Sequence, residues 1–212
     1  MFSSNTTQTS GGYQISRSLR FNSADSAYLS RTPATTTNRQ TWTWSGWVKR
    51  SALGSAQQIF GVTSNSLLIY FSALDRLVVS DSAGTVILID STSLYRDPSA
   101  WYHIVVAMDT TQATASNRTK IYVNGAQLTA FGTANYPAQN TNFDVNASVL
   151  HSIGCYGAGV TQFFNGYQTE CYLIDGQALT PSSFGETNAQ TGVWQPKAYS
   201  GSYGTNGFYL NF

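Results

Sequence analysis

The sequence contains little charge. Only 10% of its 212 residues are Asp, Glu, Lys or Arg, against about 25% in an average soluble domain. The formal net charge is +1, and no cluster of Lys or Arg could follow a phosphate backbone, so the sequence predicts no nucleic-acid partner. No apolar run approaches the length of a transmembrane helix, so no membrane contact is expected. Residues 1–12 lack the basic and apolar regions of a secretory signal, and we expect no export by that route.

Glutamate and lysine are also scarce. The chain has two Glu, Glu170 and Glu186, and three Lys. Helical proteins rely on both residue types, whereas this chain takes its polarity from Ser, Thr, Asn, Gln and Gly and is 14% aromatic. These features favour β structure and argue against disorder.

Cysteine and histidine are too few for a structural metal site. Cys155 and Cys171 do not form a C-x-x-C motif, and His103 and His151 do not complete a set of zinc ligands. We therefore expect no cofactor. The two thiols are interpreted as buried and free, although their even number also permits a disulfide between neighbouring strands.

What the sequence does contain is a series of short apolar strands separated by turn residues. Residues 41–49 alternate strictly, so Trp42, Trp44 and Val48 should share the core face with Gly46. Trp47 then lies on the opposite face. Either the tyrosine-rich tail of the chain or another subunit would cover it.

The turns support the same interpretation. Asn124 and Gly125 separate two alternating runs, which predicts a type I′ hairpin because both residue types tolerate positive φ. Residues 130–147 are interpreted as a long loop, and Thr180 with Pro181 as the start of one helical turn. About a dozen short strands with regular spacing predict a sandwich.

The sequence therefore predicts an all-β fold, an antiparallel two-sheet jelly-roll sandwich. We place the sandwich at residues 15–185, after an extended N-terminal arm at 1–14. A Tyr- and Gly-rich C-terminal segment, 186–212, should pack on the sandwich or on a partner.

Three stretches resemble laminin-G-like and pentraxin-like jelly rolls of the concanavalin A lectin type. Residues 41–49 (TWTWSGWVK) resemble their FTIEAWVK strand. Residues 101–107 and 120–125 (WYHIVVA and KIYVNG) resemble their WHHVAV and KLYVNG hairpin, and residues 164–181 resemble their closing strand. The resemblance covers residues 18–184 and implies the fold, with much less to say about activity.

A narrower resemblance concerns the end of the chain. Residues 172–186 and 192–197 resemble structural proteins of tailed bacteriophages, where such domains occur as capsid decoration or cement proteins and in tail fibres. The resemblance implies a place on the surface of a virion that is assembled in the host cytoplasm. It implies the major capsid protein or other virion subunits as partners, and we expect a homo-oligomer, a dimer or trimer.

The ionisable residues do not indicate catalysis, and we expect no enzyme. Some relatives with this fold are glucanases that place two carboxylates about 5 Å apart on an E-x-D-x-x-E strand, but Glu170 and Glu186 lie in different elements. His103 stands where the family also has His and is interpreted as structural. The eight Asp residues mostly suit turns. The alternative is a Ca²⁺ site formed by Asp90 with Asp97, or by Asp144 with a nearby carbonyl.

Contact surfaces are then the main candidates for function. Aromatic residues suit protein interfaces, and we predict partner contacts at Phe2, Tyr13, Trp47, Trp194, Tyr199 and Tyr203. Tyr156, in a Gly-rich loop, is the candidate for stacking on a glycan. We favour a structural virion protein, a decoration or cement protein that binds and stabilises the capsid shell. The alternative is a carbohydrate-binding, receptor-recognition module of a tail fibre or spike.

Overall fold

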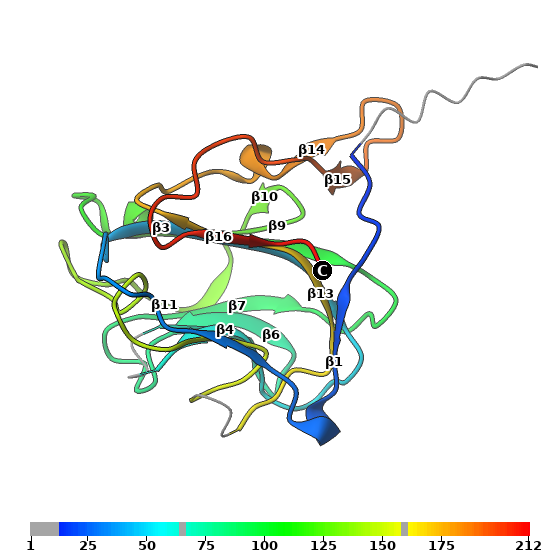
Figure 1. Cartoon of the computed structure of the whole chain (residues 1–212), viewed down its shortest axis with the longest axis horizontal. Coiled ribbons are helices and arrows are strands. Elements are labelled where there is room, and N and C mark those ends of the chain that lie inside the picture. Colours follow the sequence, from blue (N-terminus) through cyan, green and yellow to red (C-terminus); the bar gives the residue numbers. More distant parts are fainter. Residues whose placement is uncertain (1–12, 64–66, 158–160) are drawn as a thin grey trace, which may run out of the picture.

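The computed structural model describes residues 13–63, 67–157 and 161–212, and it consists of two antiparallel β-sheets packed face to face (Figure 1). Each sheet has seven strands, and helix is confined to single turns among these residues. The predicted all-β jelly-roll sandwich is confirmed. No helix in the described ranges is long and apolar enough to cross a membrane.

The first sheet, sheet A, is built around two ten-residue strands, β3 (Thr41–Arg50) and β13 (Gly166–Asp175), which pair with each other. Its order is β1-β13-β3-β8-β9-β10, and β16 pairs with the far half of β13 on the same edge as β1. The other strands of sheet A are β1 (Leu19–Phe21), β8 (Tyr102–Asp109), β9 (Thr119–Val123), β10 (Ala126–Gln127) and β16 (Phe208–Leu210).

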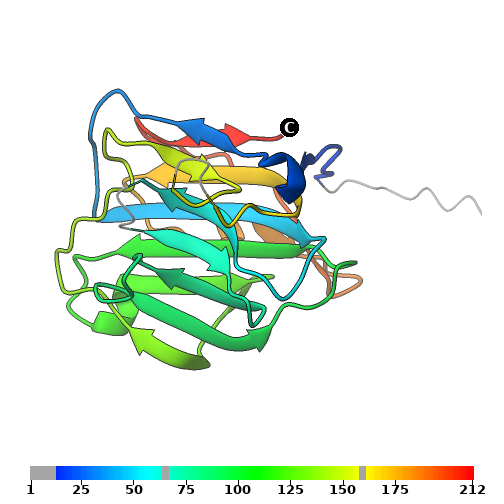
Figure 2. The same cartoon turned by 90° about the horizontal axis from the view of Figure 1, so that it is seen from below.

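The second sheet, sheet B, has the order β11-β7-β6-β5-β4-β12-β2 (Figure 2). Its strands are β2 (Leu29–Arg31), β4 (Gln57–Val62), β5 (Leu68–Phe71), β6 (Arg76–Ser80), β7 (Leu88–Leu94), β11 (Phe131–Asn135) and β12 (His151–Ile153). The helical turns are η1 (Ser23–Asp25), α1 (Ala115–Arg118) and η2 (Pro181–Ser183).

The core lies between the two sheets. The side chains of β3 alternate between its two faces, and those on the inner face fill part of this core. Trp42, Trp44 and Val48 are fully buried on the inner face, as predicted, and the ring of Trp44 stacks on Phe60 of β4 with centroids 6.3 Å apart. A Cβ atom at Gly46 would lie 2.8 Å from the Trp44 ring, so only glycine leaves room for that indole. Burial of side chains this large contributes about 2–3 kcal/mol each.

The two thiols and one ion cluster complete the interior. Cys155 and Cys171 are buried and free, which confirms the thiol interpretation.

At one end of the sandwich the carboxylate of Asp75 binds the buried guanidinium of Arg50 and also Arg96, each at 3.0 Å. Although burial raises the pKa of Asp75, the Gly54 amide and the two arginines lower it on balance.

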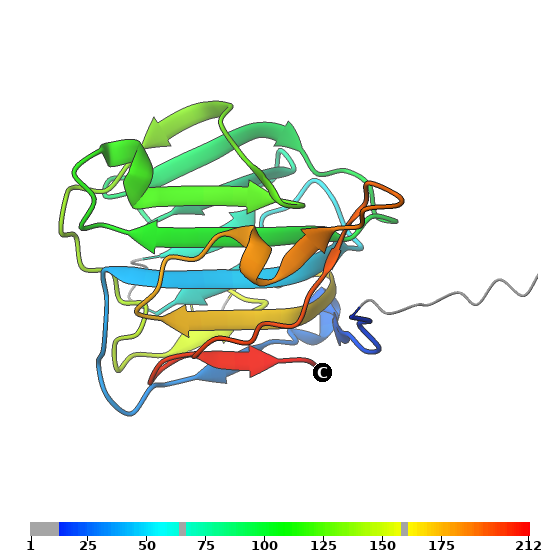
Figure 3. The same cartoon turned by 90° about the horizontal axis from the view of Figure 1, so that it is seen from above.

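The C-terminal segment covers the outer face of sheet A. After β13 the chain turns through η2 and crosses this face as the hairpin of β14 (Gly185–Thr187) and β15 (Trp194–Pro196), then returns to add β16 to the edge (Figure 3). The segment therefore both packs on the sandwich and supplies one of its strands.

Most predicted turns are confirmed, but one predicted loop is wrong. Asn124 and Gly125 have φ values of 49° and 82° between β9 and β10, and Pro181 opens η2 after Thr180. Residues 130–147, predicted as a loop, contain the edge strand β11, which pairs with β7. Its sequence, FGTAN, is poor in residues that favour strands, so the pairing with β7 and not local preference makes it extended.

Candidate functional site

Trp47 lies on the outer face of sheet A, where it is 8% exposed and lines a shallow pocket together with Pro196 of the C-terminal segment. The ring of Trp47 stacks on His103 of β8 with centroids 4.9 Å apart, and His103 stacks in turn on Trp194 of β15 at 5.9 Å. The indole N–H of Trp194 donates to Nδ1 of His103 over 3.0 Å, so the proton of the neutral imidazole lies on Nε2 and is donated to the Ser45 hydroxyl at 2.9 Å. Of the two alternatives for Trp47, cover by its own chain is confirmed.

His103 has a structural role in this stack. Its side chain is 1% exposed, and both ring nitrogens are hydrogen-bonded within the chain. Burial lowers its pKa from 6.5 to about 3. The imidazole therefore stays neutral at physiological pH and has no free nitrogen to offer a substrate.

Three of the predicted contact residues meet elsewhere on the same face. Tyr199 and Tyr203 lie against Tyr172 of β13 at centroid distances of 6.1 and 6.4 Å, and Tyr209 of β16 stacks on Tyr172 at 4.5 Å. The hydroxyl of Tyr13 lies 2.9 Å from that of Tyr209. We call these five residues the tyrosine cluster.

A buried carboxylate holds the tyrosine cluster together. Glu170 is 4% exposed and accepts hydrogen bonds from the hydroxyls of Tyr13 at 2.9 Å, Tyr172 at 2.7 Å and Tyr209 at 2.7 Å. Its φ is 50°, and the pairing of β13 with β3 shifts register between Thr169 and Tyr172. This bulge lets Thr169 and Glu170, although adjacent, both face outward.

The tyrosine cluster is a set of fixed contacts. Burial is the largest cause of the raised pKa of Tyr13, Tyr172 and Tyr209, and the carboxylate of Glu170 raises the pKa of each further. These hydroxyls therefore remain protonated donors. Tyr13 is still 37% exposed, so this one member can also contact a partner.

The predicted glycan-stacking residue, Tyr156, joins neither group. Tyr156 lies in the connection between β12 and β13, half-buried, where its backbone forms a bridge with Thr161. Phe2 lies outside the described residues.

A polar groove that the sequence analysis did not find lies beside β9. Two adjoining pockets, of about 220 and 490 Å³, share Asn117 and Lys120 as lining residues. The smaller pocket opens between β8, β9 and the turn before η2, and the larger one between β9, β10 and β11. We call the two together the Lys120 groove. Its lining includes Asp109, Gln112, Asn117, Lys120, Tyr122, Gln127, Phe131, Tyr136 and Leu179.

The Lys120 groove offers free polar groups beside apolar ones. Within the described parts of the chain, no hydrogen bond engages the side chains of Asn117, Lys120 or Tyr122. The carboxylate of Asp109 is occupied, because it accepts from the Thr111 hydroxyl and the Gln112 amide, each at 2.6 Å. Although burial raises the pKa of Asp109, these bonds lower it below 3.8 on balance. The groove can thus bind a neutral, hydroxyl-rich molecule through donors, acceptors and aromatic rings.

Little in the sequence pointed to the Lys120 groove. Lys120 is one of only three lysines, and Asn117 belongs to a polar loop that gave no motif for a binding site. The groove forms where β9 lies beside β8 and where the turn before η2 returns to the same face. Lys120 of β9 and Leu179 of this turn are about 60 residues apart in the chain, yet both line the groove.

The described acidic residues form no group of metal ligands. Across the ranges that the structure describes, no three His, Cys, Asp or Glu side chains group as metal ligands. The carboxylates considered as Ca²⁺ ligands have partners in the protein: Asp90 pairs with Arg76 at 3.1 Å, Asp97 accepts from the amide of Ser99 in its own turn at 2.8 Å, and Asp144 pairs with Arg39.

Comparison with known proteins agrees with the fold. The family model described as the concanavalin A-like lectin/glucanases superfamily matches residues 22–183. No curated protein matches the sequence.

Solved structures resemble the sandwich at low sequence identity. A Bacteroides ovatus protein described as a "putative carbohydrate binding protein" has a TM-score of 0.60 and 18% identity, over 80% of this chain and 46% of that one. The chain therefore spans less than half the length of that protein. The sialidase of Trypanosoma rangeli has a TM-score of 0.48 and 17% identity, over 68% of this chain and 22% of that one. Domain 4 of a Geobacillus stearothermophilus arabinanase, in complex with arabinotriose, has a TM-score of 0.47 and 22% identity, over 69% of this chain and 65% of that one.

Proposed function

Because the chain belongs to the concanavalin A-like lectin/glucanases superfamily, we propose that it is a non-catalytic binding domain whose ligand is a carbohydrate held in the Lys120 groove. The observation that supports this proposal is that Asn117 and Lys120, whose side chains have no hydrogen-bond partner among the described residues, line both pockets. The ring of Tyr122 lines the smaller pocket, and the rings of Phe131 and Tyr136 line the larger one. A sugar presents hydroxyls along its rim and C–H groups on its faces. Polar side chains with aromatic neighbours complement both kinds of surface.

The positions of the acids support the non-catalytic part of the proposal. Hydrolysis of a glycosidic bond ordinarily needs two carboxyl groups, about 5–9.5 Å apart, on either side of the bond. The described lining of the Lys120 groove holds one acid, Asp109, whose two oxygens are already engaged. Glu170 is enclosed by three tyrosine hydroxyls on another part of sheet A. The description of the Bacteroides ovatus protein as carbohydrate binding is in line with a sugar ligand.

The test is a glycan array followed by calorimetric titration of the glycans that bind. Lys120→Gln and Asn117→Ala should each weaken binding about tenfold, since a hydrogen bond of this kind is worth about 1–1.5 kcal/mol. Lys197→Gln is the matched control, because Lys197 lies outside the groove and its ammonium donates to the carbonyl of Ser182. An array without a hit, or equal affinity in the groove variants and the control, would overturn the proposal, and cleavage of a bound glycan would overturn its non-catalytic part.

A second proposal concerns where the domain acts. We propose that it is a structural component of a tailed-phage particle, a decoration or cement protein on the capsid, with sugar binding as an additional property. Its support is the resemblance of residues 172–186 and 192–197 to phage structural proteins, a stretch that forms η2, β14 and β15 on the outer face of sheet A. The proposed partners are the major capsid protein and further copies of the chain, as dimers or trimers.

Purified particles test this second proposal. Mass spectrometry should detect the chain in them at a stoichiometry fixed by the symmetry of the shell, and particles without it should disassemble at lower temperature. Absence of the chain from purified particles would refute a virion role without affecting the proposed sugar site.

A further inference from the structure

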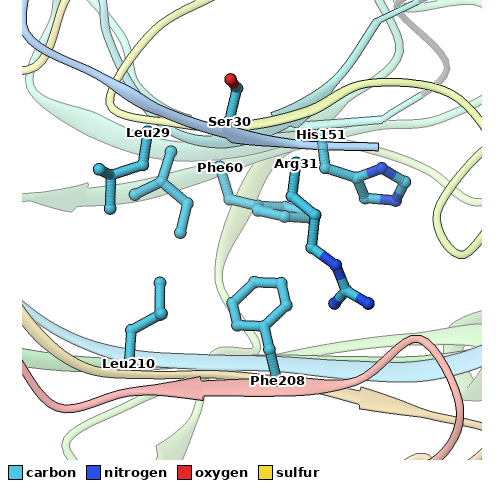
Figure 4. A pocket seen from close by; sticks show the side chains of 8 residues that line it. Leu29, Ser30, Arg31, Phe60, His151, Phe208 and Leu210 are labelled. Carbon is cyan, nitrogen blue, oxygen red and sulfur yellow. The ribbon is translucent and has the colours of Figure 1, made fainter. Parts of the chain in front are cut away.

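The edge of the sandwich farthest from the Lys120 groove carries an apolar cleft of about 250 Å³ (Figure 4). It opens between β2, β4 and β12 of sheet B and β16 of sheet A. Its apolar lining residues are Leu29, Phe60, Ile153, Phe208 and Leu210. Here β2 and β16 are edge strands, so the two sheets do not close on each other at this place.

The cleft is polarised along its length. Leu29 and Leu210 face each other at one end, whereas the guanidinium of Arg31 extends toward Phe208 at the other (Figure 4). Nη1 of Arg31 donates to the carbonyl of Asn206 at 2.8 Å, and the guanidinium carbon lies 5.8 Å from the centre of the Phe208 ring. These two contacts hold the cation at the mouth of the cleft before any ligand arrives.

No acidic residue in the described ranges balances the charge of Arg31. Arg31 forms no salt bridge with any described residue, and no acid lines the cleft. One guanidinium N–H is used by Asn206, which leaves the remaining donors open. His151 adds no charge, because Nε2 accepts from the amide of Asn146 at 3.1 Å while Nδ1 donates to the carbonyl of Val149 at 2.8 Å.

We propose that this cleft binds a small amphipathic carboxylate, such as a medium-chain fatty acid, with its carboxylate on Arg31 and its apolar chain between Leu29 and Leu210. An engineered apolar cavity of roughly 150 Å³ takes up benzene, so a cleft of 250 Å³ accommodates a longer apolar group. A planar guanidinium matches a carboxylate in two parallel hydrogen bonds. The ligand thus complements the cleft in shape at one end and in charge at the other.

The experiment titrates the protein with octanoate and with octan-1-ol, which has the same chain without the charge. NMR of the Leu and Ile methyl groups follows the binding. Octanoate should bind with a Kd on the order of 0.1–1 mM and should shift the methyl signals of Leu29, Ile153 and Leu210. Octanol should bind about ten- to hundredfold more weakly, because it forfeits the charged hydrogen bonds.

Two variants locate the site. Arg31→Gln should reduce octanoate affinity to that of octanol, while leaving octanol binding unchanged. Arg20→Gln is the matched control, because Arg20 is also an edge-strand arginine over an aromatic ring, Tyr167 at 5.2 Å, but lies outside the cleft.

Three outcomes would overturn the proposal: equal affinity for octanoate and octanol, equal effects of the two arginine variants, or methyl shifts confined to other parts of the molecule. If octanoate fails to bind and Arg31→Gln instead changes the oligomeric state, the cleft is an interface with a second copy. None of these outcomes bears on the Lys120 groove, so failure here is separate from failure of the proposed sugar site.

Discussion

Acidification from pH 7 to 4.5 should destabilise the fold through His103. In the unfolded chain the imidazole binds a proton near its ordinary pKa of 6.5, whereas burial lowers the pKa in the folded protein to about 3. The stability that the neutral ring contributes is therefore fully present above pH 6.5 and is lost as the pH falls toward 3. Each pH unit within that window costs about 1.4 kcal/mol, which integrates to about 2.5 kcal/mol between pH 7 and 4.5.

Urea unfolding followed by tryptophan fluorescence measures this loss across the pH range. The informative quantity is the difference between the wild-type protein and His103→Gln, because carboxylates titrate in both and mostly below this window. His103→Gln lowers stability at every pH but should remove about 2.5 kcal/mol of the pH-dependent part. Burial also lowers the pKa of His151, so His151→Gln is the control that removes the second histidine alone.

The pH dependence of the two proteins decides the matter. If the free energies of unfolding of wild type and His103→Gln fall in parallel between pH 7 and 4.5, the imidazole of His103 is protonated to the same extent in the folded and unfolded states. The picture of an enclosed neutral imidazole between Trp47 and Trp194 would then be wrong.

Three further predictions concern stability and are measured by the same urea unfolding at neutral pH. Trp194→Ala should lower the free energy of unfolding by about 2–4 kcal/mol, because a half-buried indole and its hydrogen bond are lost; a loss below about 1 kcal/mol would contradict the assigned contacts. Asp75→Asn should cost about 3–5 kcal/mol, since it leaves a buried arginine unpaired, whereas Asp90→Asn breaks a half-exposed pair and should cost less than about 1 kcal/mol. Gly166→Ala would place a Cβ 2.1 Å from a carbonyl oxygen of β3 and should cost more than about 2 kcal/mol, while Gly132→Ala, with nothing nearer than 3.5 Å, should be nearly neutral; equal effects would show that the close approach is not as described.

The parts of the fold that the sequence predicted are those that depend on neighbours in the chain. Trp42, Trp44 and Val48 alternate with polar residues, so their common face follows from the geometry of one strand. Asn124 and Gly125 likewise determine their own turn through backbone preference. Strand β11 was missed because its extended form depends on pairing with β7, which lies some 40 residues earlier in the chain.

The tyrosine cluster and the Lys120 groove were harder to predict, because both depend on contacts between segments that are distant in the chain. Composition identified Tyr13, Tyr199 and Tyr203 as contact residues, but not that Glu170 and Tyr209 would bind them within the chain. The bulge that turns Glu170 outward could not be predicted from the local sequence. It requires a positive φ at Glu170, a conformation that glutamate rarely adopts. The Lys120 groove was missed for the same reason, because residues between Ala107 and Tyr136 form it together with the distant turn before η2.

Glu170 also has a consequence for engineering. Tyr13 near the beginning of the described chain and Tyr209 near its end donate to the same carboxylate, and their hydroxyls lie 2.9 Å apart. The main chain at Tyr13 and the main chain at Tyr209 therefore lie within the reach of two tyrosine side chains of each other. The domain is therefore suited to insertion into a surface loop of a host protein, or to circular permutation through a short linker. In such a chimaera, the hydrogen bonds from Tyr13 and Tyr209 to the Glu170 carboxylate would hold the two junctions close to each other.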